Sequence, residues 1–530
     1  MAAWRRKALS LFPELRQDIQ DPKYSYYMLY FDLLPLCRDS HAHGDVATLH
    51  NIYAFAEWCL GQHRAKDLEN AVLVAFYEHL FDHREDWERV TPFLTREVFA
   101  ECWPLWEYRW PYWTRKFGEK EMRSLRRILV RAQSLAPSMK EAAQQRQEET
   151  MMDEWLEASA DVEEAAALTA HLVSIRSYPG EEGDVQRAVA AWLTEQGLQA
   201  ELLPTQGDRP NVIARVENGP GPTLLLNGHT DTVLAAQGWS CDPWQGKREG
   251  DRFYGLGAAD MKAGVAAAML ATRALDRARD RWRGTVIFTS VVDEEAYSIG
   301  ARALVDMRLQ ADYCVVTESG WETPTLGAVG KVLVRADITG KAAHGSWPEQ
   351  GINAAVEAAK LIARLDEMPL GAHPRLRATQ CVLSLHSGND QYVITVPEKA
   401  QFTINRHIVP GEDGESVLAE MRHLANGLNS PASFDFAIDP PYYPAWELPA
   451  EHPFAGRFAV AYAAEIGHAP TWTYGSGVAD TNYFAADLGI PSVQFGPDGG
   501  AFHQKDEWVD VRSIAGTVRV LLRLATDVLR

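Results

Sequence analysis

The sequence contains few cysteines, and their spacing does not suggest that they act together. Neither a Cys-x-x-Cys pair nor a close even spacing occurs, which argues against a disulfide framework and against a thiolate zinc site. One cysteine lies within an apolar stretch, where a buried and unreactive thiol is the expected state. The 6 cysteines among the 530 residues are Cys37, Cys59, Cys102, Cys241, Cys314 and Cys381.

Long apolar runs and an excess of basic residues are also missing. No stretch reaches the roughly 18 to 20 apolar residues that a membrane-spanning helix needs. The apolar stretch after the basic N-terminus is too short for a signal peptide, so we expect a cytoplasmic protein without a membrane partner. The chain has 52 basic and 72 acidic residues, a formal net charge of −20. Because this charge repels phosphate backbones, no nucleic-acid partner is expected.

The first part of the chain predicts only helices. At 46% hydrophobic and 23% charged residues, the sequence is typical of globular proteins and too long for a single core. Residues 1–138 have apolar side chains at three- and four-residue spacing, which indicates an all-helical N-terminal domain of unknown role. The polar residues 139–153 indicate an exposed helical linker.

Aromatic residues are concentrated near the end of this helical region. The stretch 103–113 holds Trp103, Trp106, Trp110 and Trp113. Such a stretch could stack on bases or peptides. Packing where helices meet, or against a neighbouring domain, is the favoured interpretation because the chain is acidic.

From residue 154 onward, the pattern predicts an α/β fold with an insertion. Short β-rich runs alternate with helical stretches, which favours a mixed, mostly parallel sheet. Residues 331–440 instead follow the order β-α-β-β-α-β, which predicts an inserted ferredoxin-like α+β lid. The α/β pattern then resumes. We therefore expect a discontinuous catalytic domain formed by residues 154–330 and 441–530.

Acidic and histidine residues follow several of the predicted strands. In an open parallel sheet, ligands bind in the crevice at the carboxyl ends of the strands, so residues distant in sequence can meet there. Imidazole and carboxylate groups together suit a two-metal hydrolase site that favours zinc and also accepts cobalt or manganese. The residues in such positions are His229, Asp260, Glu294, Glu295, Glu318 and His503.

Some of these residues have ordinary structural interpretations when taken alone. A single histidine after a strand, such as His229, is more often structural, but Asp231 follows two residues later and could hold its second ring nitrogen. An aspartate at a helix start, such as Asp260, is usually an N-cap. The preceding glycines lack the third glycine of a dinucleotide-binding loop.

The acidic residues after the later strands are more informative. Adjacent residues on an extended segment point in opposite directions, so one of Glu294 and Glu295 could bind metal while the other faces the substrate. A solvated acidic turn is the alternative, because Asp293 lies beside them. Glu318 follows a wholly apolar strand and needs a partner.

Four motifs together resemble a known family. They are Gly228-His229-Thr230-Asp231, Tyr254-Gly255-Leu256-Gly257-Ala258-Ala259-Asp260, Asp293-Glu294-Glu295 and Ala343-His344-Gly345. Over roughly residues 160–530, the chain is similar to the co-catalytic metallopeptidase and amidohydrolase family. That family includes acetylornithine deacetylase, succinyl-diaminopimelate desuccinylase, aminoacylase and glutamate carboxypeptidase.

The resemblance implies a role for each motif residue. Asp260 would bridge two zinc ions, one completed by His229 and Glu318 and the other by Glu295 and His503. The resemblance further implies that Glu294 is the general acid/base and that Asp231 supports His229. His344, in the lid, would bind the carbonyl oxygen, and in this family that histidine often comes from the partner subunit. Arg406 would bind a substrate carboxylate, and Asp480 would lie in a glycine-rich loop near the substrate.

The functional hypothesis is hydrolysis of an amide bond in an N-acyl amino acid or small peptide, with a free carboxylate near Arg406. A homodimer formed through the lid is implied by the resemblance. The alternative is a catalytically inactive, metal-stabilised binding or scaffold protein that recruits a partner through its helical N-terminal domain. Glu294 argues against this alternative, because a mere binder would not need it.

Overall fold

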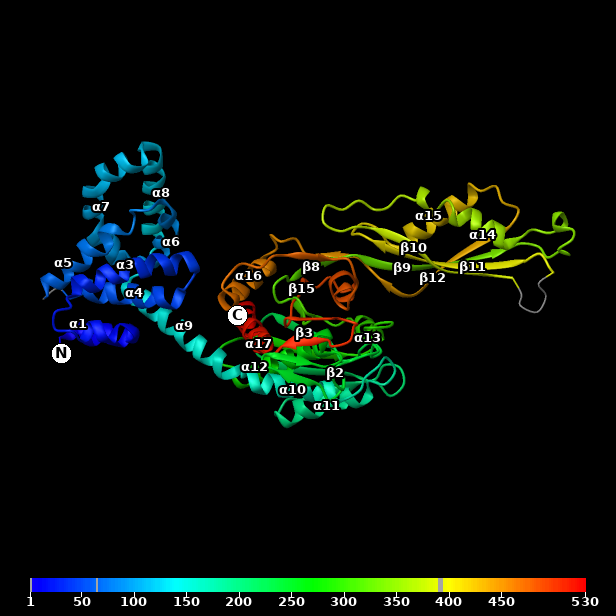
Figure 1. Ribbon diagram of the computed structural model, residues 1–530, viewed down its shortest axis with the longest axis horizontal. Coiled ribbons are helices and arrows are strands. Elements are labelled where there is room, and N and C mark those ends of the chain that lie inside the picture. The colour runs from blue at the N-terminus through cyan, green and yellow to red at the C-terminus, as the bar shows by residue number, and fades with distance from the viewer. Residues whose placement is uncertain (1, 63–64, 389–393) are drawn as a thin grey trace. The chain divides into compact units, whose positions relative to one another are not determined.

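The computed structural model describes residues 2–62, 65–388 and 394–530, which form two compact units, Met1–Trp155 and Leu156–Arg530 (Figure 1). No helix in the described part of the chain is both long and apolar enough to cross a membrane.

The first unit is all-helical in its described residues, as the apolar spacing predicts. Its core is rich in aromatic side chains, including the fully buried Trp106 and Trp113. The Trp113 indole N–H donates to Asp82 at 2.8 Å and the Trp106 indole N–H donates to the main-chain oxygen of Tyr77 at 2.9 Å, so both tryptophans pack against other segments of this unit. The helices are α1 (Ala3–Leu11), α2 (Arg16–Gln20), α3 (Tyr26–His43), α4 (Val46–Leu60), α5 (Lys66–Ala75), α6 (Trp87–Val90), α7 (Arg96–Phe117), α8 (Glu119–Leu135) and α9 (Met139–Ser159), whose last four residues belong to the second unit.

The second unit contains a mixed nine-stranded sheet with a parallel centre. Adjacent strands run in the order β1-β2-β6-β3-β7-β15-β8-β13, and β14 pairs with β8. The pairings β6-β3, β3-β7 and β7-β15 are parallel. The strands are β1 (Ala200–Leu203), β2 (Asn211–Asn218), β3 (Thr223–His229), β6 (Gly284–Val291), β7 (Tyr313–Val316), β8 (Thr325–Ala328), β13 (Trp446–Glu447), β14 (Thr473–Gly475) and β15 (Ser492–Gln494).

Helices cover this sheet, and α12 lies deepest among them. Its residues Ala263–Leu275 are all buried, and it packs against β3, β6, α10 and α17. The alanine-rich sequence of α12 allows this close packing because its side chains are small. The helices of this layer are α10 (Val162–Ser174), α11 (Gly183–Glu195), α12 (Ala263–Arg277), α13 (Ile299–Asp306), α16 (Pro453–Ile466) and α17 (Val511–Val528).

Gly264 allows α12 to approach the residue that follows β7. A Cβ atom added at Gly264 would lie 1.9 Å from the main-chain oxygen of Thr317. We expect Gly264→Ala to lower the free energy of unfolding by about 1–3 kcal/mol, because backbone has to move. Urea denaturation measures this change. Gly456 in α16 is the matched control, since a Cβ there meets no atom within 4 Å. Equal losses in both variants would contradict the explanation.

The predicted lid is present as a four-stranded antiparallel sheet in the order β10-β11-β9-β12. This is the strand order of a β-α-β-β-α-β unit, and its helices bury one face of the sheet. The lid elements run from Gly330 to Tyr443, close to the expected 331–440. They are β9 (Gly330–Thr339), α14 (Ala354–Ile362), β10 (Thr379–Ser387), β11 (Lys399–Ile408), α15 (Gly414–Asn426) and β12 (Ser433–Tyr443).

A second small sheet joins the C-terminal segment to the loop before α12. Its order is β16-β17-β5-β4, and β17 pairs with β5. This sheet brings the turn between β16 and β17, which contains His503, to the segment that contains Asp260. The strands are β4 (Lys247–Glu249), β5 (Arg252–Tyr254), β16 (Gly499–Gly500) and β17 (Trp508–Asp510).

Candidate metal centre

Most of the predicted site residues lie at the carboxyl ends of the parallel strands in the centre of the large sheet. His229 is the last residue of β3, Glu294 and Glu295 follow the end of β6, and Glu318 follows β7. These three strands are adjacent and buried, which explains the uninterrupted apolar runs before the polar residues. The sequence-based expectation that their carboxyl ends form one site agrees with this arrangement.

Asp260 lies at the middle of the cluster, with its two carboxylate oxygens facing different histidines. Its Oδ1 is 3.3 Å from Nε2 of His229, and its Oδ2 is 3.2 Å from Nε2 of His503. This is the arrangement that a carboxylate bridging two cations requires.

Each of the two histidines also lies near one glutamate. Nε2 of His229 is 3.5 Å from Oε1 of Glu318, and Nε2 of His503 is 3.1 Å from Oε1 of Glu295. Each histidine therefore faces one glutamate and one oxygen of Asp260. The donor atoms of His229, Asp260 and Glu295 all lie within 4.8 Å of one another.

The buried nitrogen of His229 shows that the donors fit a cation. Nε2 of His229 is buried and has no hydrogen-bond partner among the described residues, although Asp260 and Glu318 face it. A buried polar atom without a partner is costly, and a coordinated cation would satisfy it. Imidazole nitrogens and carboxylate oxygens are the donors that zinc, cobalt and manganese accept.

Burial and mutual repulsion shift the pKa values of the acids in the cluster. Burial, reinforced by Asp260, raises the pKa of Glu295 to about 7. Burial, reinforced by Asp260 and Glu295, raises the pKa of Glu318 to about 8 although His229 opposes the shift. Burial opposes charge on His229, but the surrounding carboxylates outweigh it and raise its pKa. Bound cations would relieve the repulsion between these acids.

Asp231 supports the site differently from the expected way. The main-chain oxygen of Asp231, rather than its carboxylate, accepts from Nδ1 of His229 at 3.1 Å, while the nearest carboxylate oxygen is 3.5 Å away. The other carboxylate oxygen accepts from the main-chain N–H of Glu295 at 2.9 Å. A proton on Nδ1 leaves Nε2 free to bind a cation. Asp231 thus links both histidine and glutamate donors.

Glu294 is largely, but not fully, buried beside the donors and does not pair closely with any of them. Its Oε2 is 3.9 Å from Nε2 of His229. Burial raises its pKa well above the usual value, and the charge of Asp480 adds to this shift. Asp480 is itself buried, and neither of its carboxylate oxygens has a hydrogen-bond partner among the described residues. Burial raises the pKa of Asp480 to about 7.

A cavity of about 310 Å³ opens onto the cluster. This volume suits a small ligand. The glycine-rich loop predicted to lie near the substrate supplies one wall. The lining residues are Asp260, Glu294, Glu295, Glu318, Ser319, Thr325, Ala328, Gly475, Gly477, Val478, Ala479, Gln494, Phe502 and His503.

The two lid residues do not join this cluster. His344 is exposed, and its Nδ1 accepts from the main-chain N–H of Ser346 at 3.1 Å. It is not among the residues that line the cavity. The exposed ring is therefore free to contact a ligand or a second chain.

The expectation that Arg406 faces the metal site is corrected by its position in the lid. Its side chain is fully buried on the face of β11 that the lid helices cover. The guanidinium donates to Glu412 at 2.9 Å, to Gln380 at 3.2 Å and to the main-chain oxygen of Pro369 at 2.6 Å. These lid groups neutralise the arginine and hold its two terminal nitrogens, so it is not available at the cavity in this structure.

Glu507 is a supporting residue that the sequence did not reveal. It is buried, and its carboxylate accepts the main-chain N–H groups of Gly257, Ala259 and Asp260 at 2.8–3.0 Å. It thus fixes the turn that presents the central carboxylate. In sequence it ends the run Lys505-Asp506-Glu507, which is indistinguishable from a solvated charged segment.

We expect Glu507→Gln to loosen the turn, because an amide offers only one acceptor oxygen for these N–H groups. Metal affinity, measured by zinc titration against a competing chelator, should fall about 10- to 100-fold. Glu195→Gln, at an exposed position, is the control. Unchanged affinity in both variants would show that the turn holds its shape without Glu507.

Comparisons with known proteins agree with this architecture. The model of the family described as peptidase family M20/M25/M40 matches residues 225–527, and one described as a domain of unknown function (DUF7674) matches residues 5–107. A succinyl-diaminopimelate desuccinylase from Methylobacterium radiotolerans is 30% identical over 341 residues, covering 61% of this chain and 85% of that protein.

Two solved structures have the same fold. The aminopeptidase PepT of Bacillus cereus superimposes with a TM-score of 0.60 at 24% identity, covering 70% of this chain and 100% of that one. The YXEP protein of Bacillus subtilis, described as a dinuclear metal binding peptidase, gives a TM-score of 0.55 at 19% identity, covering 69% and 98%. The predicted fold class is confirmed.

Proposed function

Because the chain belongs to peptidase family M20/M25/M40 and is therefore a metal-dependent hydrolase of C–N bonds, we propose that its substrate is an N-acyl amino acid or a small peptide and that its cations are zinc. The observation that carries the proposal is the position of Asp260, with one oxygen toward His229 and the other toward His503.

The residues around the cavity have two different roles in amide hydrolysis, metal binding and proton transfer. His229, Asp260, Glu295, Glu318 and His503 would hold the two cations. Bound there, the cations would polarise the amide carbonyl and lower the pKa of the attacking water toward about 7. Glu294, buried and facing the cavity, accepts a proton from that water and returns it to the departing amine. Burial raises its pKa, which increases the proton affinity that a general base needs.

An inactive scaffold is a poorer explanation of the same residues. A scaffold needs metal ligands, but it gains nothing from burying Glu294 beside other acids, since burial of an unpaired carboxylate costs free energy. A general acid/base gains from that burial because its proton affinity increases.

The exposed His344 suits a role in a dimer. We propose that the lid pairs with the lid of a second copy in a cytoplasmic homodimer, and that His344 of one copy helps to bind the carbonyl oxygen at the site of the other. Support comes from its exposure and from its absence from the cavity of its own chain.

A substrate screen tests the proposed function. The full-length protein, reconstituted with zinc, is incubated with N-acetyl, N-succinyl and N-aminoacyl amino acids, and amine release is measured. We expect turnover of at least one carboxylated amide and none after dialysis against chelator. No turnover of any of these compounds with bound zinc would refute the substrate assignment.

The pH dependence of metal-free stability tests the donor cluster separately. The pKa values of Glu295 and Glu318, raised to about 7 and about 8, exceed the ordinary 4.5. Groups with a higher pKa when folded bind more protons in the folded state, so their stabilisation is full below pH 4.5 and lost as the pH rises to about 8. The hydrogen bond to Asp260 raises the pKa of His503 from 6.5 to about 9, which acts in the same direction.

We therefore expect the melting temperature of the chelator-treated protein to fall between about pH 5 and pH 9. Zinc should reduce this fall because it displaces the protons. Calorimetric scans with and without zinc measure the effect. A metal-free melting temperature that rises over this range would contradict the clustering of these groups.

A further inference from the structure

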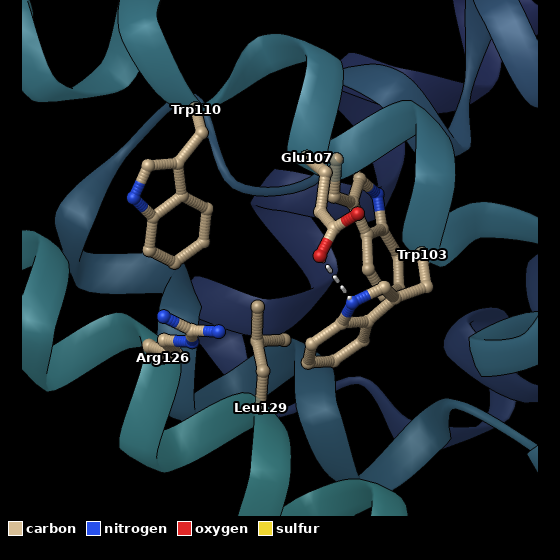
Figure 2. A pocket seen from close by; sticks show the side chains of 6 residues that line it. Trp103, Glu107, Trp110, Arg126 and Leu129 are labelled. Carbon is tan, nitrogen blue, oxygen red and sulfur yellow. Dashed lines mark hydrogen bonds between the residues drawn. The ribbon is translucent and has the colours of Figure 1, made fainter.

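The helical N-terminal unit contains a tryptophan-lined cavity that the proposed hydrolysis does not use. It has a volume of about 230 Å³ and lies between α7 and α8 (Figure 2). Its lining residues are Trp103, Trp106, Glu107, Trp110, Arg126 and Leu129. The structure therefore refines the sequence-based interpretation: Trp113 is a buried packing residue, whereas Trp103, the buried Trp106 and Trp110 line a cavity.

Hydrogen bonds hold two of the three indoles in place. The buried Trp106 donates to the main-chain oxygen of Tyr77 at 2.9 Å, and Trp103 donates to Oε1 of Glu107 at 3.0 Å. Figure 2 shows Trp103 and Trp110 on opposite sides of the cavity, with Leu129 between them. A cavity of this size with fixed indole walls suits one large apolar side chain, and such anchors dominate the affinity of many interfaces.

A row of basic side chains continues from this cavity along α8. Between Arg115 and Arg131 the sequence has seven basic residues and two acidic ones, in a chain whose net charge is −20. Glu121, one of the two acids, pairs with Arg84 at 2.9 Å outside the row. In the part of the chain that the structure describes, no ion pair is present at the row. Its exposed members are Lys120, Arg123, Arg126, Arg127 and Arg131.

The geometry of the row suits a series of carboxylates. Arg123, Arg127 and Arg131 are four residues apart on one helix, so they are about 6 Å apart along its axis. Alternate residues of an extended peptide are about 6.6 Å apart and share one face. Val130, 52% exposed, adds apolar surface within the row. Arg126 lines the tryptophan cavity and also lies in the row, so the two features are continuous.

We propose that α7 and α8 form a docking site for an acidic peptide segment of a partner protein. The segment inserts one large apolar side chain between Trp103 and Trp110 and places its carboxylates along the row of Arg123, Arg127 and Arg131. A nucleic acid suits this surface less well, because Glu107 lies in the cavity wall, where its carboxylate would repel the phosphate of a nucleotide stacked there.

Fluorescence anisotropy with the full-length protein tests this site. The probe is a labelled ten-residue peptide, blocked at both ends, with a central leucine and aspartates at alternate positions. Two competitor peptides replace the leucine with alanine or the aspartates with lysine, and a single-stranded oligonucleotide is the third competitor. We expect micromolar binding that weakens with salt, and at least about tenfold weaker competition by the alanine peptide.

Protein variants assign the binding to these residues. Trp110→Ala, and the pair Arg123→Glu with Arg127→Glu, should each weaken binding at least about tenfold. Arg16→Glu, a single charge reversal at an exposed position on α2 and outside the row, is the control and should bind normally. Trp110→Phe should retain most of the affinity, which guards against loss of folding. Absence of peptide binding, equal weakening by Arg16→Glu, or stronger competition by the oligonucleotide would overturn the proposal.

Discussion

Glu294→Gln should strongly slow hydrolysis while leaving the metal content unchanged. The amide side chain has almost the same volume and stays in the same buried position, but it cannot accept a proton from water. General acid–base catalysis contributes about 10²–10⁴-fold, so kcat should fall by that factor with little change in KM. Steady-state amine release measures the rate, and elemental analysis of the same sample measures the bound metal.

The geometry explains why the metal should remain. Glu294 lies 3.9 Å from Nε2 of His229, farther than Asp260 at 3.3 Å and Glu318 at 3.5 Å. Removing its charge also relieves repulsion among buried acids, so metal-free stability should rise or stay constant. Glu195→Gln serves as the exposed control. Loss of metal in Glu294→Gln would reassign this residue as a ligand, and retained activity would exclude it as the base.

The metal centre could be predicted from the sequence because adjacent parallel strands place residues that are distant in sequence close together in space. Each donor follows a short apolar run, and buried parallel strands end at a common edge. Glu318 was recognisable because an acid beyond a wholly apolar strand needs a partner. The assignment of Asp260 as the bridging ligand and of His503 to the same cation as Glu295 depended on the family resemblance, since their loops carry no periodic pattern that would define this pairing.

Other features depended on tertiary contacts that sequence patterns do not encode. Arg406 alternates with apolar residues on β11, and only the position of Glu412 shows that its guanidinium turns into the lid. Glu507 is similar, because nothing in a charged run distinguishes a buried acceptor from a solvated acid. The tryptophan cavity required the relative placement of α7 and α8.

Asp260→Asn should remove the dinuclear centre and all activity, the largest effect expected of any single donor. An amide offers one neutral oxygen where the carboxylate presents two charged ones, at 3.3 Å from His229 and 3.2 Å from His503. Bound metal, measured by elemental analysis, should fall from two ions to at most one per chain. Activity should fall below detection, since the remaining donors cannot hold both cations at one crevice.

The metal contents of Glu318 and Glu295 variants show whether Asp260 binds both cations or only one. Glu318→Gln and Glu295→Gln each change the surroundings of only one histidine. Each variant should therefore weaken the binding of one cation and leave the binding of the other unchanged. If Asp260 bridges, its variant must lose more metal than either of these. Equal losses in all three variants would mean that Asp260 serves a single cation, and the two-metal mechanism would then have no common ligand to hold its ions together.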